Sequence, residues 1–122
     1  FVFKYGIPLE CDLVFDVRFI PNPYYIESLK RLSGKHENVR DYVLKMPETV
    51  EFLEKLNSML DFLIPNYVKE GKSQLVIGIG CTGGRHRSVV ITDELAESLN
   101  QKGYRTIVEH RDMDRDSRGV GR

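Results

Sequence analysis

A stripe of apolar residues at three- and four-residue steps predicts the main helix of the chain. Pro47 suits a first helical turn, and we expect this helix over residues 47–67, with Pro65 kinking or ending its last turn and Gly71 stopping it. A shorter helix is predicted over residues 37–46. Such spacing places apolar side chains on one helical face, so we assign the stripe to core packing. The stripe consists of Val50, Leu53, Leu56, Leu60 and Leu63.

Four short segments rich in β-branched and aromatic residues predict strands. They span residues 1–5, 13–19, 74–79 and 104–109. A glycine-rich turn over residues 80–84 follows the third strand and leads into a predicted helix over residues 86–101. A strand, helix and strand in this order form a right-handed crossover with parallel strands. We therefore predict an α/β domain with a small, mostly parallel sheet flanked by helices.

The predicted second strand ends in two charged residues. Asp16 and Arg18 are two positions apart, so their side chains project from the same face of the strand. A rigid aromatic loop, Pro21-Asn22-Pro23-Tyr24-Tyr25, follows them, because its two prolines remove amide donors and restrict the backbone. One interpretation of the charges is a structural ion pair with each other or with loop amides.

Composition narrows the class of protein. The chain has 122 residues, of which 41% are apolar and 30% charged, as in a water-soluble domain. Eighteen Lys plus Arg balance eighteen Asp plus Glu, so any basic site must be a small patch. Cys11 and Cys81 provide neither a disulfide framework nor a four-ligand metal cluster. Without a leader or an apolar run of about 20 residues, we expect a cytoplasmic protein with no membrane contact.

The strongest functional signal is the run Gly-Cys-Thr-Gly-Gly-Arg-His-Arg-Ser from Gly80 to Ser88. It lies between a predicted buried strand and a helix, where small residues allow left-handed dihedrals and backbone N–H groups converge at the positive end of the helix dipole. Phosphate binds such turns, and hydroxyl, imidazole and guanidinium groups add donors to it. The expected ligand contacts are Cys81, Thr82, Gly83, Gly84, Arg85, His86, Arg87 and Ser88.

A plain structural turn is the alternative to an anion site. In that case Gly83 and Gly84 only permit a tight bend, and Arg85 and Arg87 are solvated charges. Cations at a helix N-terminus, however, oppose the dipole by roughly 0.3 kcal/mol or more each. Two Arg and one His are unfavourable there unless an anion occupies the turn, so the sequence favours the anion site.

The same run matches the Cys-x5-Arg-Ser/Thr pattern of protein tyrosine phosphatases. Cys81 stands five residues before Arg87 and would be the nucleophile, in a setting of amides and Arg side chains that favours a thiolate. Two features weaken this alternative. Gly80 replaces the usual His before the Cys, and no general-acid loop is evident, although Asp16 and Asp112 are candidates. The other interpretation of Cys81 is a small buried apolar residue.

Four motifs together resemble the C-terminal domain of the RapZ/YvcJ family, over residues 1 to about 112. They are Phe3-Lys4-Tyr5-Gly6-Ile7-Pro8, Val14-Phe15-Asp16-Val17-Arg18-Phe19, Pro21-Asn22-Pro23 and the run from Ile79 to Ser88. The resemblance implies a phosphofructokinase-like three-layer module that senses glucosamine 6-phosphate. It also implies an N-terminal P-loop domain that binds ATP or GTP. This chain has no Gly-x4-Gly-Lys-Ser/Thr run and starts without Met, so we expect that domain to be missing here.

The resemblance also implies roles for individual residues. The run from Gly80 to Ser88 would hold the sugar phosphate, and Asp16 with Arg18 would address the sugar, Asp16 pairing with its protonated amine. Tyr24 and Tyr25 either wall the pocket or pack on the surface. Some family members deliver small RNAs to a ribonuclease, so a small RNA or a regulatory protein is a further expected partner, and we expect self-association. No cofactor is expected in this domain.

Two departures from the family pattern affect these expectations. Tyr24 stands where family members often carry His, so the sugar contacts are expected to differ. RNA-binding members end in a basic run, whereas Asp112, Asp114 and Asp116 alternate with Arg in the C-terminal segment of this chain, which largely cancels the field that captures RNA. We predict that the segment from His110 onward is a solvated tail, with residues 113–122 flexible.

Overall fold

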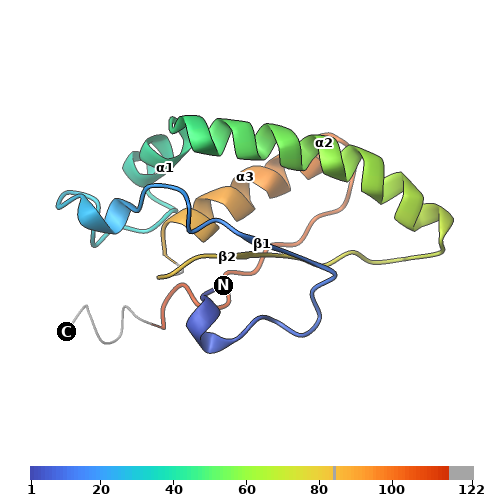
Figure 1. Cartoon of the computed structure of the whole chain (residues 1–122), viewed down its shortest axis with the longest axis horizontal. Helices are drawn as coiled ribbons and strands as arrows, with labels where there is room; N and C mark the ends of the chain where they lie inside the picture. Colours follow the sequence, from blue (N-terminus) through green and yellow to red (C-terminus); the bar gives the residue numbers. More distant parts are fainter. Residues whose placement is uncertain (84, 116–122) are drawn as a thin grey trace.

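A computed structural model describes residues 1–83 and 85–115 of the chain. Three α-helices and two strands form its regular part, together with two short 3-10 turns (Figure 1). In chain order these elements are η1 (Phe3–Tyr5), β1 (Leu13–Asp16), η2 (Pro23–Tyr25), α1 (Glu37–Leu44), α2 (Pro47–Lys69), β2 (Ile77–Gly80) and α3 (Arg87–Gln101). The α/β class predicted from the sequence is confirmed, and the predicted central strand, turn and helix are present as β2 and α3.

The sheet is small and parallel, as predicted. β1 pairs with β2 in a register that places Leu13 opposite Ile77 and Asp16 opposite Gly80. The opposite edge of β2 meets the first residues of the chain: Val2 forms a parallel bridge with Cys81, and the Cys81 N–H donates to the Phe1 carbonyl at 2.9 Å. β2 is therefore the central strand, and the turn that follows it starts from a fixed position.

The helices bury their apolar faces against one another and against β2. In Figure 1, α1, α2 and α3 lie on one side of the sheet, while η1 lies on the other. α3 contacts β2, α1 and α2, so it is the helix that links the sheet to the rest of the core. Fully or almost fully buried core residues include Val17, Ile20, Val39, Val43, Leu60, Ile79, Val90 and Ile91.

Two predicted strands are wrong. In residues 1–5 only Val2 forms a bridge, because the chain turns into η1 and then reaches Gly6 at a φ of 88°. Residues 104–109 join no sheet within the described part of the chain. Their first hydrogen bonds are local instead: the Tyr104 N–H donates to the Leu99 carbonyl, and the Thr106 N–H donates to Asn100 Oδ1. Acceptors at the end of α3 thus bond the backbone N–H groups that would otherwise pair with a neighbouring strand.

Pro65 does not end the long helix, contrary to one of the two predicted outcomes. α2 continues to Lys69, and Gly71 follows with a φ of 91°. Pro65 lacks the N–H that would bond the Asp61 carbonyl, but it lies on the exposed side of the helix, where water can bond that carbonyl. The predicted stop at Gly71 is confirmed.

Residues 110–113 are at least partly buried where the sequence predicted a solvated tail. Asp112 is 1% exposed. Its carboxylate accepts a hydrogen bond from the Val2 N–H at 2.8 Å and forms ion pairs with Arg111 and Arg115. An apolar-poor sequence therefore folds here through buried polar contacts. Residues 116–122, which make up most of the predicted flexible tail, lie outside the described residues.

Among the described residues, no helix combines the length and the apolar character that crossing a membrane requires.

Candidate anion-binding site

The turn between β2 and α3 starts from a tightly packed position at Gly80. A Cβ atom on Gly80 would lie 2.6 Å from ring atoms of Phe1 and Phe3, so a larger residue at the end of β2 would push these rings aside. The chain then passes through Cys81, Thr82 and Gly83 and enters α3 at Arg87. The site therefore lies at the carboxyl end of a parallel sheet, where ligands of α/β proteins commonly bind.

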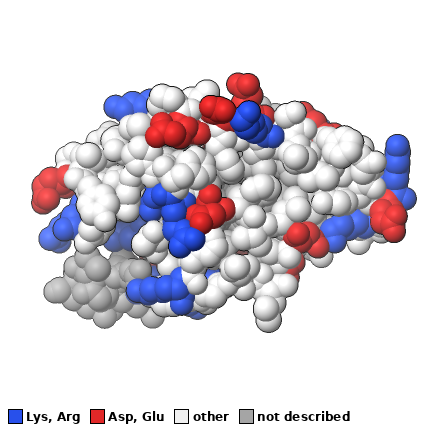
Figure 2. All heavy atoms as spheres, in the orientation of Figure 1, with Lys and Arg blue, Asp and Glu red and all other residues white. Residues whose placement is uncertain are grey.

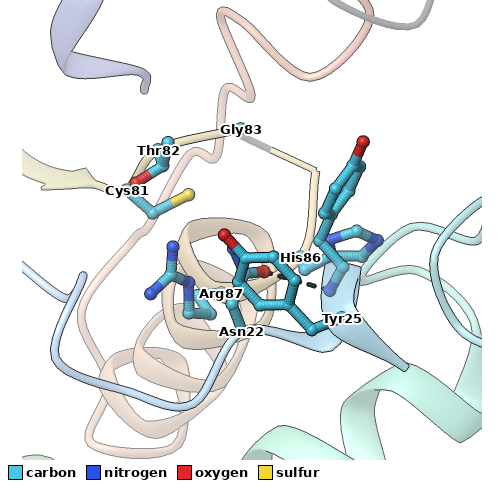
Figure 3. Close-up of a pocket in the computed structure, with 8 residues that line it drawn as sticks. Asn22, Tyr25, Cys81, Thr82, Gly83, His86 and Arg87 are labelled. Atoms are coloured by element: carbon cyan, nitrogen blue, oxygen red, sulfur yellow. Dashed lines mark hydrogen bonds between the residues drawn. The ribbon is translucent and has the colours of Figure 1, made fainter. Parts of the chain in front are cut away.

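A pocket of about 190 Å³ opens at this turn (Figure 3). Two segments of the chain form its walls: the turn itself and the aromatic loop that follows β1. The lining residues are Asn22, Tyr24, Tyr25, Cys81, Thr82, Gly83, His86 and Arg87. Segments about 60 residues apart in the sequence thus share one cavity.

Arg87 provides a buried positive charge at this pocket. It is 4% exposed, and its Nη1 donates hydrogen bonds to the carbonyl oxygens of Arg18 at 2.7 Å and Ile20 at 2.8 Å. Burial lowers the pKa of Arg87; a guanidinium nevertheless stays protonated in proteins. Arg87 forms no ion pair within residues 1–83 and 85–115. A buried cation held only by neutral carbonyls attracts an anionic ligand.

The N-terminus of α3 adds to this positive field. The helix has 15 residues, no acidic residue in its first turn and, among the described residues, no side chain that caps it. The N–H groups of Arg87, Ser88 and Val89 begin the helix, and the first helical bond runs from the Val90 N–H to the His86 carbonyl. Because Arg87 and the helix N-terminus meet at one pocket, the arrangement suits an oxyanion such as phosphate.

Cys81 and Ser88 lie next to each other at the base of the turn. Cys81 is 2% exposed, and its thiol donates a hydrogen bond to the Ser88 hydroxyl oxygen at 3.1 Å. Cys81 also lines the pocket (Figure 3). Ser88, which the sequence predicted as a ligand contact, does not line the pocket. Its hydroxyl accepts the hydrogen bond from Cys81 instead.

Two predicted contacts of the turn bond to protein carbonyls instead. The Arg85 Nη2 donates to the Arg31 carbonyl at 2.9 Å, and Arg85 is not among the residues that line the pocket. His86 lines the pocket, but its Nε2 lies 2.6 Å from the Leu32 carbonyl. Burial lowers the pKa of His86, so the imidazole is neutral at pH 7 and its Nε2–H donates to this carbonyl. Both residues anchor the turn to residues 31–34.

Asp16 and Arg18 pair with each other. The Arg18 guanidinium contacts both carboxylate oxygens of Asp16, with Nη2 at 2.6 Å from Oδ2. The hydrogen bond from Arg18 lowers the pKa of the Asp16 carboxyl. Neither residue lines the pocket, although Asp16 lies opposite Gly80, one residue before Cys81. The structure thus shows the ion-pair interpretation, with about half of each side chain exposed.

Comparison with known proteins identifies the chain. The family model described as the RapZ C-terminal domain matches residues 1–114. The chain belongs to the RapZ C-terminal domain family. It is 63% identical over its whole length to a nucleotide-binding protein of Ruminiclostridium cellulolyticum, of which it covers 42%. A nucleotide-binding protein of Clostridium beijerinckii is 66% identical over 95% of the chain, which covers 40% of that relative. The chain thus spans about two fifths of these relatives.

The glycines of the turn act differently from the sequence prediction. In this RapZ C-terminal domain the positive-φ residues among those described are Gly6, Gly71 and Gly103. Gly83 is not one of them, and a Cβ built on it meets nothing within 4 Å. The prediction that left-handed dihedrals shape the turn is therefore wrong for Gly83. Gly84 lies outside the described residues.

Asn22 is the pocket residue that the sequence analysis missed. The signal that could have found it was its place in the loop after β1, since ligands of α/β proteins commonly bind beside the carboxyl ends of parallel strands. Tyr24 and Tyr25 do wall the pocket, which is one of the two predicted outcomes. The pocket of this RapZ domain therefore has a cationic half, formed by the turn and α3, and an uncharged half, formed by residues 22–25.

Proposed function

We propose that this domain is a sensor that binds a phosphorylated sugar, with glucosamine 6-phosphate as the first candidate, and performs no chemistry on it. The phosphate group would occupy the cationic half of the pocket. The observation that carries the proposal is Arg87, a buried cation without an ion pair in the described part of the chain, facing a pocket at the N-terminus of α3. The ligand would receive hydrogen bonds from Thr82, Arg87 and first-turn N–H groups.

The charge distribution favours a small metabolite over a long polyanion such as RNA. Figure 2 shows Lys and Arg interspersed with Asp and Glu on the visible face, and the formal net charge is zero. A polyanion needs an extended field of one sign, whereas a single phosphate group needs only one concentrated site. We therefore propose the sugar phosphate as ligand ahead of RNA.

Calorimetry with two matched variants tests this proposal. Arg87→Gln removes the charge but keeps an amide donor for the carbonyls of Arg18 and Ile20, and we expect at least a tenfold loss of glucosamine 6-phosphate affinity. Arg85→Gln removes a charge from the same turn, but Arg85 is bonded to Arg31 outside the pocket, so affinity should change less than about threefold. Equal effects of the two variants, or no binding by the parent domain, would contradict the proposal.

A cysteine phosphatase is the second candidate, and the contact between Cys81 and Ser88 favours it. The Cys81 sulfur lines the pocket, and Ser88 directly follows Arg87, as the phosphatase pattern requires. The sulfur would attack phosphorus as the ester P–O bond breaks, and water would then cleave the S–P bond. No carboxylate is among the described residues that line the pocket, so a general acid is missing and we rank this function second. Turnover of a generic phosphomonoester that disappears in Cys81→Ser would support it.

A second part of the proposal concerns nucleotide binding outside this chain. The relatives named above are nucleotide-binding proteins, and the present chain covers about two fifths of their length. We propose that ATP or GTP binds outside these 122 residues, because the sequence has no Gly-x4-Gly-Lys-Ser/Thr run. Ligand occupancy in the sensor domain would then be transmitted to the nucleotide-binding part or to a partner, within a self-associated protein.

A further inference from the structure

The uncharged half of the pocket is not explained by phosphate binding. Phosphate requires positive charge and donors, which Arg87 and α3 supply, whereas Asn22, Tyr24 and Tyr25 carry no charge. We propose that Asn22 and Tyr25 form a second subsite that binds the sugar ring: the Asn22 amide donates to a ring oxygen or hydroxyl, and Tyr25 packs against the C–H face. This inference rests on the proposed function, because the phosphate is taken to lie at the turn.

The direction of the Asn22 amide follows from the cap that it makes on η2. Its Oδ1 accepts a hydrogen bond from the Tyr24 N–H at 3.1 Å, shown as a dashed line in Figure 3. An N–H needs an acceptor, so the oxygen must face Tyr24 and the NH2 group must face away from it. Within residues 1–83 and 85–115 this NH2 group donates to no protein atom. A donor on the pocket wall is thus oriented by the fold and left for a ligand.

Asn22 is also held rigidly. It lies between Pro21 and Pro23, whose rings fix their own φ angles and restrict the residues before them. It adopts a φ of −87° and a ψ of 115° as the N-cap of η2. A donor fixed in this way loses little conformational entropy when a ligand binds, which raises its contribution to affinity.

Tyr25 has the placement expected of a residue that packs on a sugar. This large aromatic residue is 81% exposed and lines the pocket. Its ring contacts the Tyr24 ring edge to face, with centroids 5.7 Å apart. In Figure 3 its hydroxyl points toward the side of the pocket where Cys81 and Arg87 lie. A ligand that fills the pocket would cover this apolar ring surface, which stabilises the complex.

The chemistry of this subsite determines what it distinguishes. An amide NH2 group donates, so it recognises oxygen acceptors and not an ammonium group. Glucose 6-phosphate and glucosamine 6-phosphate both offer such oxygens, whereas inorganic phosphate has no ring. Asn22 and Tyr25 should therefore separate sugar phosphates from inorganic phosphate and should not separate amino sugars from other sugars.

Calorimetry on the 122-residue chain with glucosamine 6-phosphate and inorganic phosphate tests the subsite. Asn22→Ser keeps a side-chain oxygen that can accept from the Tyr24 N–H but removes the amide donor. We expect its affinity for the sugar phosphate to fall about tenfold and its affinity for inorganic phosphate to change less than about twofold. Tyr25→Ala should show the same selective loss without altering the cap. Asn66→Ser, on α2, is the matched control and should change neither affinity.

The outcomes separate this inference from the proposed function. If both ligands weaken equally in Asn22→Ser and in Tyr25→Ala, the loop acts only on the shape of the turn and the subsite is wrong. If inorganic phosphate binds and neither variant changes the ratio of the two affinities, the subsite is wrong while the anion site remains. If neither ligand binds the parent domain, the anion site itself fails, and the inference built on it fails as well.

Discussion

Two buried charges, Arg87 and Asp112, are satisfied in different ways. Asp112, at the corner that it forms with the first residues of the chain, has two Arg counter-ions and a backbone N–H donor. Arg87, the first residue of α3, donates to two neutral carbonyls and pairs with no carboxylate among the described residues. Counter-ions neutralise the charge of a buried group. Neutral carbonyls do not, so the positive charge of Arg87 remains uncompensated among the described residues. The first charge is structural, and we propose that the second is available to a ligand.

The largest expected effect on the free energy of unfolding comes from removing the structural charge of Asp112. Asp112→Asn leaves Arg111 and Arg115 without a counter-ion, and we expect the free energy of unfolding, measured by urea denaturation, to fall by about 2 kcal/mol. The exposed Glu109→Gln, in the same part of the chain, is the matched control and should change it by less than about 0.5 kcal/mol. A loss no larger than that of the control would show that the ion pairs at this corner are not structural.

The pH dependence of the same variant sharpens the assignment. Burial raises the pKa of the Asp112 carboxyl, but hydrogen bonds from Arg111 and the Val2 N–H outweigh it, so this pKa lies below its ordinary value. A carboxyl with a lowered pKa stabilises the fold above about pH 4 and loses that contribution as the pH falls further. The difference in free energy of unfolding between the parent and Asp112→Asn should therefore be constant near pH 7 and shrink toward pH 3. A difference that grows in acid would contradict this.

The next largest effect concerns the contacts that anchor the turn between β2 and α3. A Cβ on Gly34 would lie 2.8 Å from the Val89 Cβ and 2.9 Å from the His86 carbonyl oxygen, whereas a Cβ on Gly83 meets nothing. Gly34→Ala should thus lower the free energy of unfolding by about 1.5 kcal/mol, and Gly83→Ala should leave it within about 0.5 kcal/mol. Thermal unfolding of both variants checks this. A larger loss in Gly83→Ala would restore the predicted need for glycine at that position.

A smaller effect comes from His86, which ties the turn to Leu32. Burial, reinforced by the charges of Arg85 and Arg87, lowers the pKa of this imidazole. The unfolded chain therefore takes up the proton first, and stability should fall as the pH drops from about 7 to 5. His86→Gln keeps a donor for the Leu32 carbonyl and should reduce this slope. An unchanged slope would assign the pH dependence to other groups.

The smallest expected effect on stability is that of Asp16→Asn, because the ion pair with Arg18 is about half exposed. This variant is more informative about ligand binding than about stability. If Asp16 leaves Arg18 to accept a protonated amine, the ratio of affinities for glucosamine 6-phosphate and glucose 6-phosphate should fall severalfold in this variant. An unchanged ratio would leave Asp16 as the partner of Arg18 alone.

Local patterns determined much of this RapZ domain. The 3.6-residue period placed α2 and α3, and the apolar run with glycines placed β2 and the turn, because such periodicities record which side of an element faces the core. The same run predicted an anion site, which stays a prediction, because a strand, small residues and a helix start suffice to predict converging N–H groups. Cys81, Thr82, Gly83, His86 and Arg87 do line one pocket, as their neighbourhood in the sequence suggested.

Only the tertiary structure decided which side chains of the turn line the pocket and which bond to protein carbonyls elsewhere. Arg85 and Arg87 are two residues apart and chemically identical, yet the carbonyls that fix them belong to residues 31 and 18–20. Asn22 joined the pocket beside a turn far away in the chain, and Asp112 became buried against Val2, 110 positions away. Hydrogen-bond partners far away in the sequence leave no periodic signal, so their choice appears only once the chain is folded.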